Sequence, residues 1–175
     1  AAVCSGASNT PFRLYKHWEH EGGIAAPLIA HWPKGIPASR RNRLEHQPAH
    51  LIDLMATAVD LAGAKYPSEF RGNKIQPREG TSLRPAFAGK PLRRQSPLFW
   101  EHEGNRAIRE GQWKLVSKHP GPWELYDLEA DRTELNNLAT RFPEKARLLA
   151  AKWERWAQRV GVQPWPIRSP APNQK

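Results

Sequence analysis

Four short segments between residues 98 and 126 constrain the fold more than any other part of the sequence. They are short runs rich in apolar residues, separated by polar loops and turns, and the last of them alternates apolar with polar side chains; they are 98–100, 106–109, 112–117 and 123–126. Short runs of this kind, with Glu110-Gly111 as a hairpin turn, predict an antiparallel sheet of about four strands. Pro143 then opens a stretch with apolar residues on one helical stripe, namely Ala146, Leu149, Trp153, Trp156 and Val160. We therefore expect residues 98–162 to form a small α+β subdomain in which this helix crosses one face of the sheet.

The first part of the chain has a different pattern. The apolar run from Ile24 to His31 predicts a short buried strand. Residues 50–62 have apolar side chains at the spacing of one helix face, and Gly63 stands where a C-terminal cap belongs. A strand followed by a helix is typical of an α/β layer. The residues of the predicted apolar helix face are Leu51, Leu54, Met55, Ala58, Val59, Leu61 and Ala62.

The composition is that of a folded protein with a strong positive charge. Hydrophobic residues make up 39% of the chain and charged residues 25%, so general disorder is not expected. The formal net charge of +10 suits either nucleic acid or small anionic substrates. Because the basic residues are scattered and no nucleic-acid-binding signature is present, we expect no nucleic-acid partner. No run approaches about twenty apolar residues, so we expect no membrane span, and no signal peptide is visible.

Residues 10–23 combine charged, imidazole and aromatic side chains more densely than any other stretch. Asn9 to Arg13, then Tyr15-Lys16, then Glu21-Gly22-Gly23 resemble the active-site lysine segment of type I sulfatases, the arylsulfatase family of the alkaline-phosphatase-like superfamily. The resemblance continues in the order of that family over roughly residues 6–166. The further matching segments are Pro27-Leu28-Ile29, Trp32-Pro33-Lys34-Gly35, His50-Leu51-Ile52-Asp53, Glu79-Gly80-Thr81-Ser82-Leu83, Trp113-Lys114-Leu115 and Glu124-Leu125-Tyr126-Asp127.

The resemblance is to the C-terminal portion of a sulfatase only. It implies that residues 1–63 end the catalytic α/β domain, that 64–97 connect two domains, that 98–162 form the C-terminal subdomain and that 163–175 are a proline-rich tail. The remainder of the same catalytic domain is then an expected partner, carried by sequence before residue 1. The implied activity is hydrolysis of sulfate esters of a sulfated small molecule or sulfated glycan. The implied location is periplasmic or extracellular.

Lys16 is the catalytic candidate, because the resemblance aligns it with the sulfate-contacting lysine of the family. An ammonium group can stabilise the negative charge that develops on the sulfate and leaving oxygens. Candidates for binding the organic part of the ester are His17, Trp18, His20, His102 and Arg106. Each has a structural alternative. The first three could brace their own loop, and the last two could belong to a hairpin loop that satisfies its own hydrogen bonds.

The family also uses calcium and a formylglycine nucleophile, and we expect both to be supplied upstream of this chain. Cys4 is followed by Ser5-Gly6-Ala7-Ser8 and lacks the Pro and Arg of Cys-x-Pro-x-Arg, so it is not the expected nucleophile. This polypeptide alone is therefore expected to be inactive. His17 and His20 could ligate zinc, but they lack the pattern His-Glu-x-x-His and a nearby cysteine pair, so we assign no metal ligand.

Two other functions are compatible with the sequence. One is a related phosphohydrolase or phosphodiesterase of the same superfamily. The other is a non-enzymatic module that binds polyanions or glycans through exposed tryptophans and basic side chains.

Overall fold

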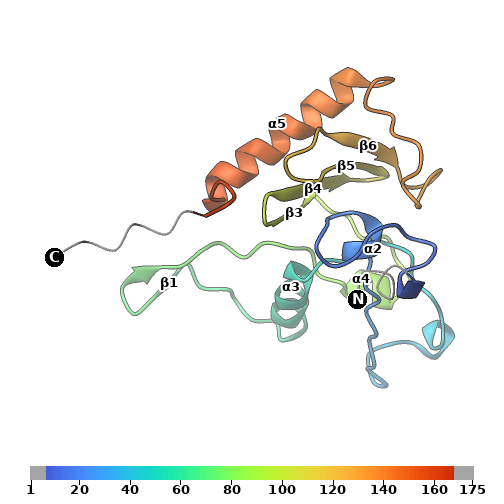
Figure 1. The fold of residues 1–175 in the computed structure, drawn as a ribbon. Coiled ribbons are helices and arrows are strands. Elements are labelled where there is room, and N and C mark those ends of the chain that lie inside the picture. The colour runs from blue at the N-terminus through green and yellow to red at the C-terminus, as the bar shows by residue number, and fades with distance from the viewer. Residues whose placement is uncertain (1–6, 168–175) are drawn as a thin grey trace. The chain divides into compact units, whose positions relative to one another are not determined.

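The computed structural model describes residues 7–167, which fold into two compact units (Figure 1). Of the described residues, 7–27 and 97–167 form one unit, called the sheet unit below, and 28–96 form the second unit. These units are not consecutive along the chain, because the N-terminal segment packs with the C-terminal sheet.

The sheet unit contains the predicted four-stranded antiparallel sheet. Its strands are β3 (Leu98–His102), β4 (Asn105–Glu110), β5 (Trp113–Ser117) and β6 (Glu124–Asp127), paired in sequence order. Glu103 and Gly104 connect β3 to β4 with φ of 52° and 79°, the positive values that a two-residue type I′ turn needs at both positions. Gly111, with φ of 60°, begins the equally short turn between β4 and β5.

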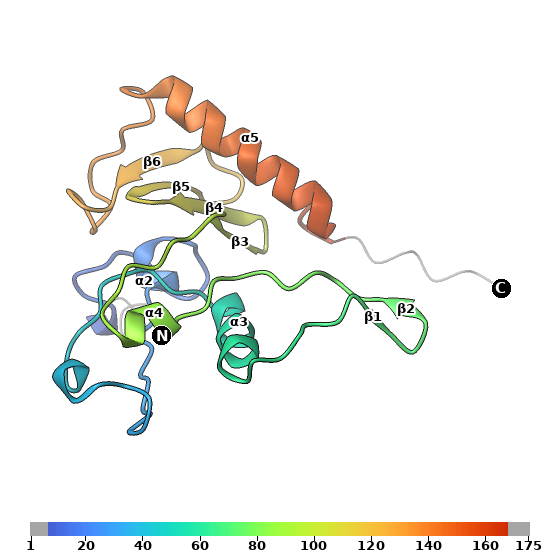
Figure 2. The same ribbon diagram turned by 180° about the vertical axis from the view of Figure 1, so that it is seen from behind.

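The helix α5 (Pro143–Val160) covers one face of this sheet, as both views show (Figures 1 and 2). Its side chains pack on alternate sheet residues of that face. The buried cluster consists of Ile108, Leu115, Leu125, Leu149, Trp153 and Ala157. Gly161 ends the helix in a left-handed conformation with φ of 76°. Val160 is 45% exposed, so the end of the predicted stripe is turned away from the core and Ala157 takes its place.

The opposite face of the sheet is covered by the N-terminal segment, which includes the short helix α2 (Glu21–Ile24). The apolar part of this face is a second cluster formed by Ala107, Val116, Tyr126 and Leu128. The strand predicted over residues 24–31 is not present. After α2 these residues are irregular, and residues 26–31 are exposed. A strand needs a hydrogen-bonding neighbour, and the strand pairs of the described residues leave none beside this segment.

The second unit contains four short elements and one longer helix. They are the 3₁₀ helix η1 (Ala38–Arg40), α3 (Ile52–Leu61), the hairpin strands β1 (Glu69–Phe70) and β2 (Asn73–Lys74), and α4 (Arg84–Phe87). The helix α3 confirms the prediction for residues 50–62. Its buried side is formed by Asp53, Ala56 and Thr57, however, and the predicted apolar face is exposed. No helix within residues 7–167 is long and apolar enough to cross a membrane.

Candidate functional site

The loop that carries Lys16 is fastened to the sheet by Arg13. The Nη1 atom of Arg13 donates to the backbone carbonyl of Glu134 at 2.7 Å and to the Tyr126 hydroxyl at 3.3 Å. It also lies 4.0 Å from a carboxylate oxygen of Glu124. The guanidinium presents several donors in a fixed geometry, so one side chain can join the loop to two distant segments. Arg13 is therefore a structural brace of the loop.

A buried ionic cluster fastens the other end of the loop. The Nζ atom of Lys114 lies 3.1 Å from Glu21 and 2.8 Å from Glu134, and the Lys114 side chain is fully buried. The second oxygen of Glu134 accepts the backbone N–H of Glu21 at 2.7 Å. Burial by itself would raise the pKa of Glu21, but Lys114, Arg109 and Arg132 together hold it below the ordinary value. Glu21 thus remains ionised and ties α2 to β5.

Gly22 and Gly23 allow the loop to close on itself. A Cβ atom on Gly22 would overlap the backbone carbonyls of Arg13 and Leu14, and one on Gly23 would overlap the carbonyl of Trp18. The Gly22 N–H donates to the Arg13 carbonyl at 3.1 Å. The pair is needed here for close backbone approach within the loop, a use of glycine that its missing side chain permits.

Lys16 stands at the corner of this closed loop. The Trp18 N–H donates to the Tyr15 carbonyl at 2.9 Å, which places Lys16 and His17 at the two central positions of a turn. The rings of Tyr15 and Trp18 meet edge to face with centroids 4.8 Å apart. Lys16 is exposed, while its neighbours on both sides are held in place.

His17 and His102 come together, and Glu103 joins them. The Nδ1 atom of His17 lies 3.2 Å from a carboxylate oxygen of Glu103, and the two imidazole rings meet edge to face at 5.8 Å. Trp18 also contacts His17 edge to face at 5.1 Å. Three of the predicted binding residues therefore lie near Lys16. His17 follows it in the sequence, and Trp18 and His102 both contact His17. Glu103 was not among the predicted site residues.

Asn105 holds the two segments of this cluster together. Its side-chain Nδ2 donates to the backbone carbonyl of His17 at 3.0 Å and to that of His102 at 2.9 Å. Its Oδ1 accepts the backbone N–H of His119 at 3.0 Å. Asn105 is only 2% exposed, so its amide is satisfied by protein groups. One buried side chain therefore fixes the distance between segments that lie far apart in the sequence.

His20 does not share this environment. Its side chain is fully buried, its Nε2 lies 3.2 Å from Glu124, and its ring contacts Tyr126 at a centroid distance of 6.4 Å. His20 and Tyr126 donate hydrogen bonds that hold the pKa of Glu124 at about 2 in spite of its partial burial. A side chain with no exposed surface in the sheet unit cannot touch a substrate, so these contacts correct the prediction for His20 to a structural role.

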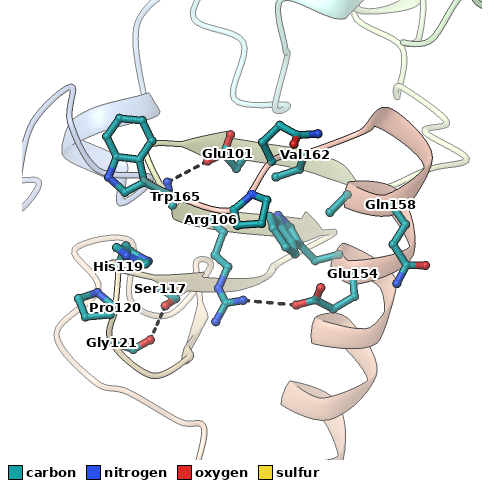
Figure 3. Close-up of a pocket in the computed structure, with 15 residues that line it drawn as sticks. Glu101, Arg106, Ser117, His119, Pro120, Gly121, Glu154, Gln158, Val162 and Trp165 are labelled. Carbon is teal, nitrogen blue, oxygen red and sulfur yellow. Dashed lines mark hydrogen bonds and ion pairs between the residues drawn. The ribbon is translucent and has the colours of Figure 1, made fainter. Parts of the chain in front are cut away.

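Arg106 lies on the opposite face of the sheet. Its guanidinium stacks over the rings of Trp123 at 4.2 Å and Trp153 at 5.6 Å, and it pairs with Glu154 of α5 at 3.3 Å. It lines an open cavity of about 470 Å³ between β3, β4 and the end of α5, with Trp165 at its rim (Figure 3). Because successive side chains of a strand point to opposite faces, Arg106 is separated from the His17 cluster, contrary to their predicted grouping.

Residues 12–157 match the model of one protein family, described as N-sulphoglucosamine sulphohydrolase, C-terminal. The chain belongs to this sulfatase family. The match confirms the resemblance drawn from the sequence, and the four-stranded sheet with its C-terminal helix is the expected C-terminal subdomain of a sulfatase.

Individual sulfatases show the same relationship. An uncharacterized sulfatase of Schizosaccharomyces pombe is 31% identical over 163 residues, which cover 89% of this chain and 29% of that protein. The N-acetylgalactosamine-6-sulfatase of Canis lupus familiaris is 35% identical over 114 residues, covering 65% and 20% of the two chains. This chain therefore spans less than a third of the length of these relatives.

A solved structure shares the arrangement. The crystal structure of Ps i-CgsB matches with a TM-score of 0.70 and 30% identity, covering 90% of this chain and 34% of the other. The same protein in complex with k-i-k-neocarrahexaose matches with a TM-score of 0.56, covering 73% and 27%.

The calcium that the sulfatase family implies does not fit the side chains described here. Within residues 7–167, one group of three potential metal ligands lies close together, and it consists of His17, His102 and Glu103. Ca²⁺ prefers six to eight oxygen ligands, whereas two of these three are imidazoles. The buried carboxylates of Glu21 and Asp53 are occupied by Lys114 and Arg94. We therefore derive no catalytic step of this chain through calcium. Cys4 lies outside the described residues.

Sequence reasoning missed Glu103 and Asn105 as parts of the site. The available signal for Glu103 was its place in the polar loop after Trp100, directly beside His102. Nothing in the sequence indicated that Asn105 would reach His17, since that contact depends on how the N-terminal loop docks on the sheet.

Proposed function

We propose that this chain is the C-terminal part of an enzyme that hydrolyses sulfate esters, and that it supplies a lysine to the active site. The single observation that carries the proposal is the placement of Lys16. It is an exposed cation at the corner of a loop whose two ends are fixed by Arg13 and by the buried Lys114 cluster. Membership of the sulfatase family supports the assignment of reaction type.

The proposed role of Lys16 follows from its charge. In sulfate ester hydrolysis negative charge builds up on the sulfuryl oxygens and on the departing oxygen. A fixed ammonium group aimed at these atoms stabilises the transition state more than the ground state, which lowers the barrier. The braced loop fixes the backbone at Lys16, which limits the reorganisation needed to bring its ammonium group to the reacting atoms. The overall charge of +10 would also attract an anionic ester.

We propose His17, Trp18 and His102 as contacts to the organic part of the ester. They lie next to Lys16 and combine ring surface with hydrogen-bonding nitrogens, which suits a sugar or another polar alcohol. A relative described as an N-acetylgalactosamine-6-sulfatase and a solved neighbour in complex with k-i-k-neocarrahexaose support a sulfated glycan as the substrate class. Arg106 belongs to the cavity under α5 and is not part of this proposed subsite.

The remainder of the catalytic domain is the proposed partner of the second unit. The apolar face of α3 is exposed, with Leu51 at 76%, Leu54 at 45% and Met55 at 57% of their surfaces. Ile29, in the segment predicted as a strand, is 89% exposed. Apolar surface of this extent is typical of an interface that another part of the protein covers. We further propose a periplasmic or extracellular location, which rests on the family resemblance alone.

The experiment that tests the function is turnover of a sulfate ester by the complete protein with Lys16 replaced. We expect Lys16→Ala to lower kcat by about a hundredfold or more, because one preorganised charge contact to the transition state is lost. Lys74→Ala, an exposed lysine in the hairpin of the second unit, is the matched control and should leave kcat unchanged. Normal turnover in Lys16→Ala, or equal activity of the parent toward a phosphate monoester, would overturn the proposal.

A further inference from the structure

The cluster of His17, His102 and Glu103 has the ligand set of a transition-metal site. Each residue offers one ligand atom, and the three atoms lie within 4.8 Å of one another. Two imidazole nitrogens and one carboxylate oxygen form a combination that binds Zn²⁺ in many proteins and leaves a coordination position open. Mg²⁺ and Ca²⁺ prefer all-oxygen ligands, so the chemistry of the set selects borderline metals such as Zn²⁺, Co²⁺ or Ni²⁺.

The distances are close to those that a bound metal requires. Tetrahedral Zn²⁺ with bonds near 2.0–2.1 Å brings its ligand atoms to about 3.3 Å from one another. The pair formed by His17 Nδ1 and Glu103 Oε2 already lies at 3.2 Å. The largest separation in the group therefore has to close by at most about 1.5 Å. His102 is the ligand that has to move, and its side chain is exposed.

The backbone positions of the three ligands are fixed before any metal binds. Asn105 bonds the carbonyls of His17 and His102, and its own burial keeps that bridge away from water. Glu103 occupies a tight turn with φ of 52°, and Trp18 packs against the edge of the His17 ring. A metal site gains affinity from such preorganisation, because binding then orders little more than three side-chain ends.

The site is open to solvent. The side chains of His17 and Glu103 are 41% and 39% exposed, and His102 is exposed. A metal can therefore reach the three ligands without opening the fold, and water or an external anion can occupy a further position. The Glu103 carboxylate supplies local negative charge, which offsets part of the net positive charge of the chain.

We propose that His17, His102 and Glu103 bind one divalent transition-metal ion, with Zn²⁺ as the best fit. Neither the family match nor the proposed hydrolysis of sulfate esters enters this inference, because it rests on three side chains and the amide that spaces them. His17 belongs to the loop that carries Lys16, whereas His102 and Glu103 lie at the tip of the β3–β4 hairpin. A bound metal ion therefore strengthens the contact between these two segments.

The test is titration of the complete, untagged protein with ZnCl₂ in a calorimeter, together with the visible spectrum of the Co²⁺ form. We expect one saturable site per chain and a Co²⁺ spectrum typical of a tetrahedral nitrogen and oxygen environment. His102→Ala and Glu103→Gln should each weaken binding by at least about tenfold. The matched control is His46→Ala, which removes an exposed histidine of the second unit and should leave the affinity unchanged.

His102 ends β3 with an exposed side chain, and Glu103 begins the adjacent turn with its side chain 39% exposed, so circular dichroism should show an unchanged fold. A parent chain without saturable binding, or a site that keeps its affinity in both His102→Ala and Glu103→Gln, overturns the proposal. Equal loss in His46→Ala overturns it as well, since binding would then be distributed over surface histidines. The Co²⁺ spectrum of the parent is an independent check: an octahedral, all-oxygen spectrum contradicts the proposed ligands without any substitution.

Discussion

Replacement of Lys114 by methionine tests whether the buried ionic cluster holds the lysine loop on the sheet. Lys114 is fully buried, and its Nζ lies 3.1 Å from Glu21 and 2.8 Å from Glu134, whose side chains are 3% and 0% exposed. Methionine fills a similar volume without the charge, so the loss reports mainly on the two stranded carboxylates. Breaking a buried pair by removing one partner costs about 3–5 kcal/mol, and we expect the free energy of unfolding at pH 7 to fall by this amount.

The loss of unfolding free energy in Lys114→Met should become smaller as the pH falls. In the parent the pKa of Glu21 lies below its ordinary value of 4.5, so its contribution to stability is present above that value and is lost as the pH falls through the lowered pKa. Without Lys114 the effect of burial, which by itself raises the pKa of Glu21, is opposed less strongly, so Glu21 binds a proton more readily in the folded state. The difference between parent and Lys114→Met is therefore largest near pH 7 and shrinks as the pH falls toward about 4.

Urea unfolding, followed by tryptophan fluorescence and far-UV circular dichroism at several pH values, measures this difference. The control is Lys118→Met, which removes a half-buried lysine that directly follows β5. This variant should change the free energy of unfolding by less than about 1 kcal/mol. The triple variant Lys114→Met, Glu21→Gln and Glu134→Gln should recover part of the loss, because the two carboxylates that pair with Lys114 are then uncharged. A loss in Lys114→Met below about 1 kcal/mol, or one that does not change with pH, would refute the reasoning.

Two further predictions concern the sheet unit. Trp153→Ala should destabilise it by about 3–5 kcal/mol, since that ring is 5% exposed within the main core, whereas Val160→Ala on the exposed end of α5 should cost less than about 1 kcal/mol; equal urea midpoints for the two variants would contradict the packing. The pKa of Glu124 is held at about 2 by His20 first, with Tyr126 and Arg13 adding to the effect against partial burial. Its contribution, at most about 3 kcal/mol, should be present above pH 4.5 and disappear as the pH falls toward 2, so stability curves of the parent and Glu124→Gln should converge in acid. Parallel curves over that range would show that Glu124 is not coupled to these partners.

The sheet and its helix could be derived from the sequence because they depend on local order. The short runs between residues 98 and 126 and the stripe from Pro143 correspond to β3–β6 and α5 within a few residues. Adjacent strands joined by short turns pair with one another, so the topology follows from the turns. The lysine segment was also identified from the sequence, since its motif lies within fourteen consecutive residues.

The strand predicted at Ile24 to His31 and the apolar face of α3 show where local patterns were insufficient. The apolar run at 24–31 and the apolar face of α3 both indicate residues suited to burial, but burial requires a second surface that covers them. In the described residues the strand has no hydrogen-bonding neighbour, and α3 buries the side that carries Asp53. Asp53 is held there by two bonds from Arg94 and one each from the backbone N–H groups of His50 and Thr81.

The sequence by itself determined strands β3–β6, the helix α5 and the family, and it singled out Lys16 as the catalytic candidate. Only the tertiary structure decided which polar residues share a site, because that depends on strand pleat and on docking between distant segments. Because the strand is pleated, Arg106 lies on the sheet face that α5 covers. His20 is buried and has no surface for a ligand. Asn105 bonds the backbone of both His17 and His102 and so holds them together. Asn105 and His17 are 88 positions apart in the sequence. No periodicity in the N-terminal loop or in the strands predicts such a contact.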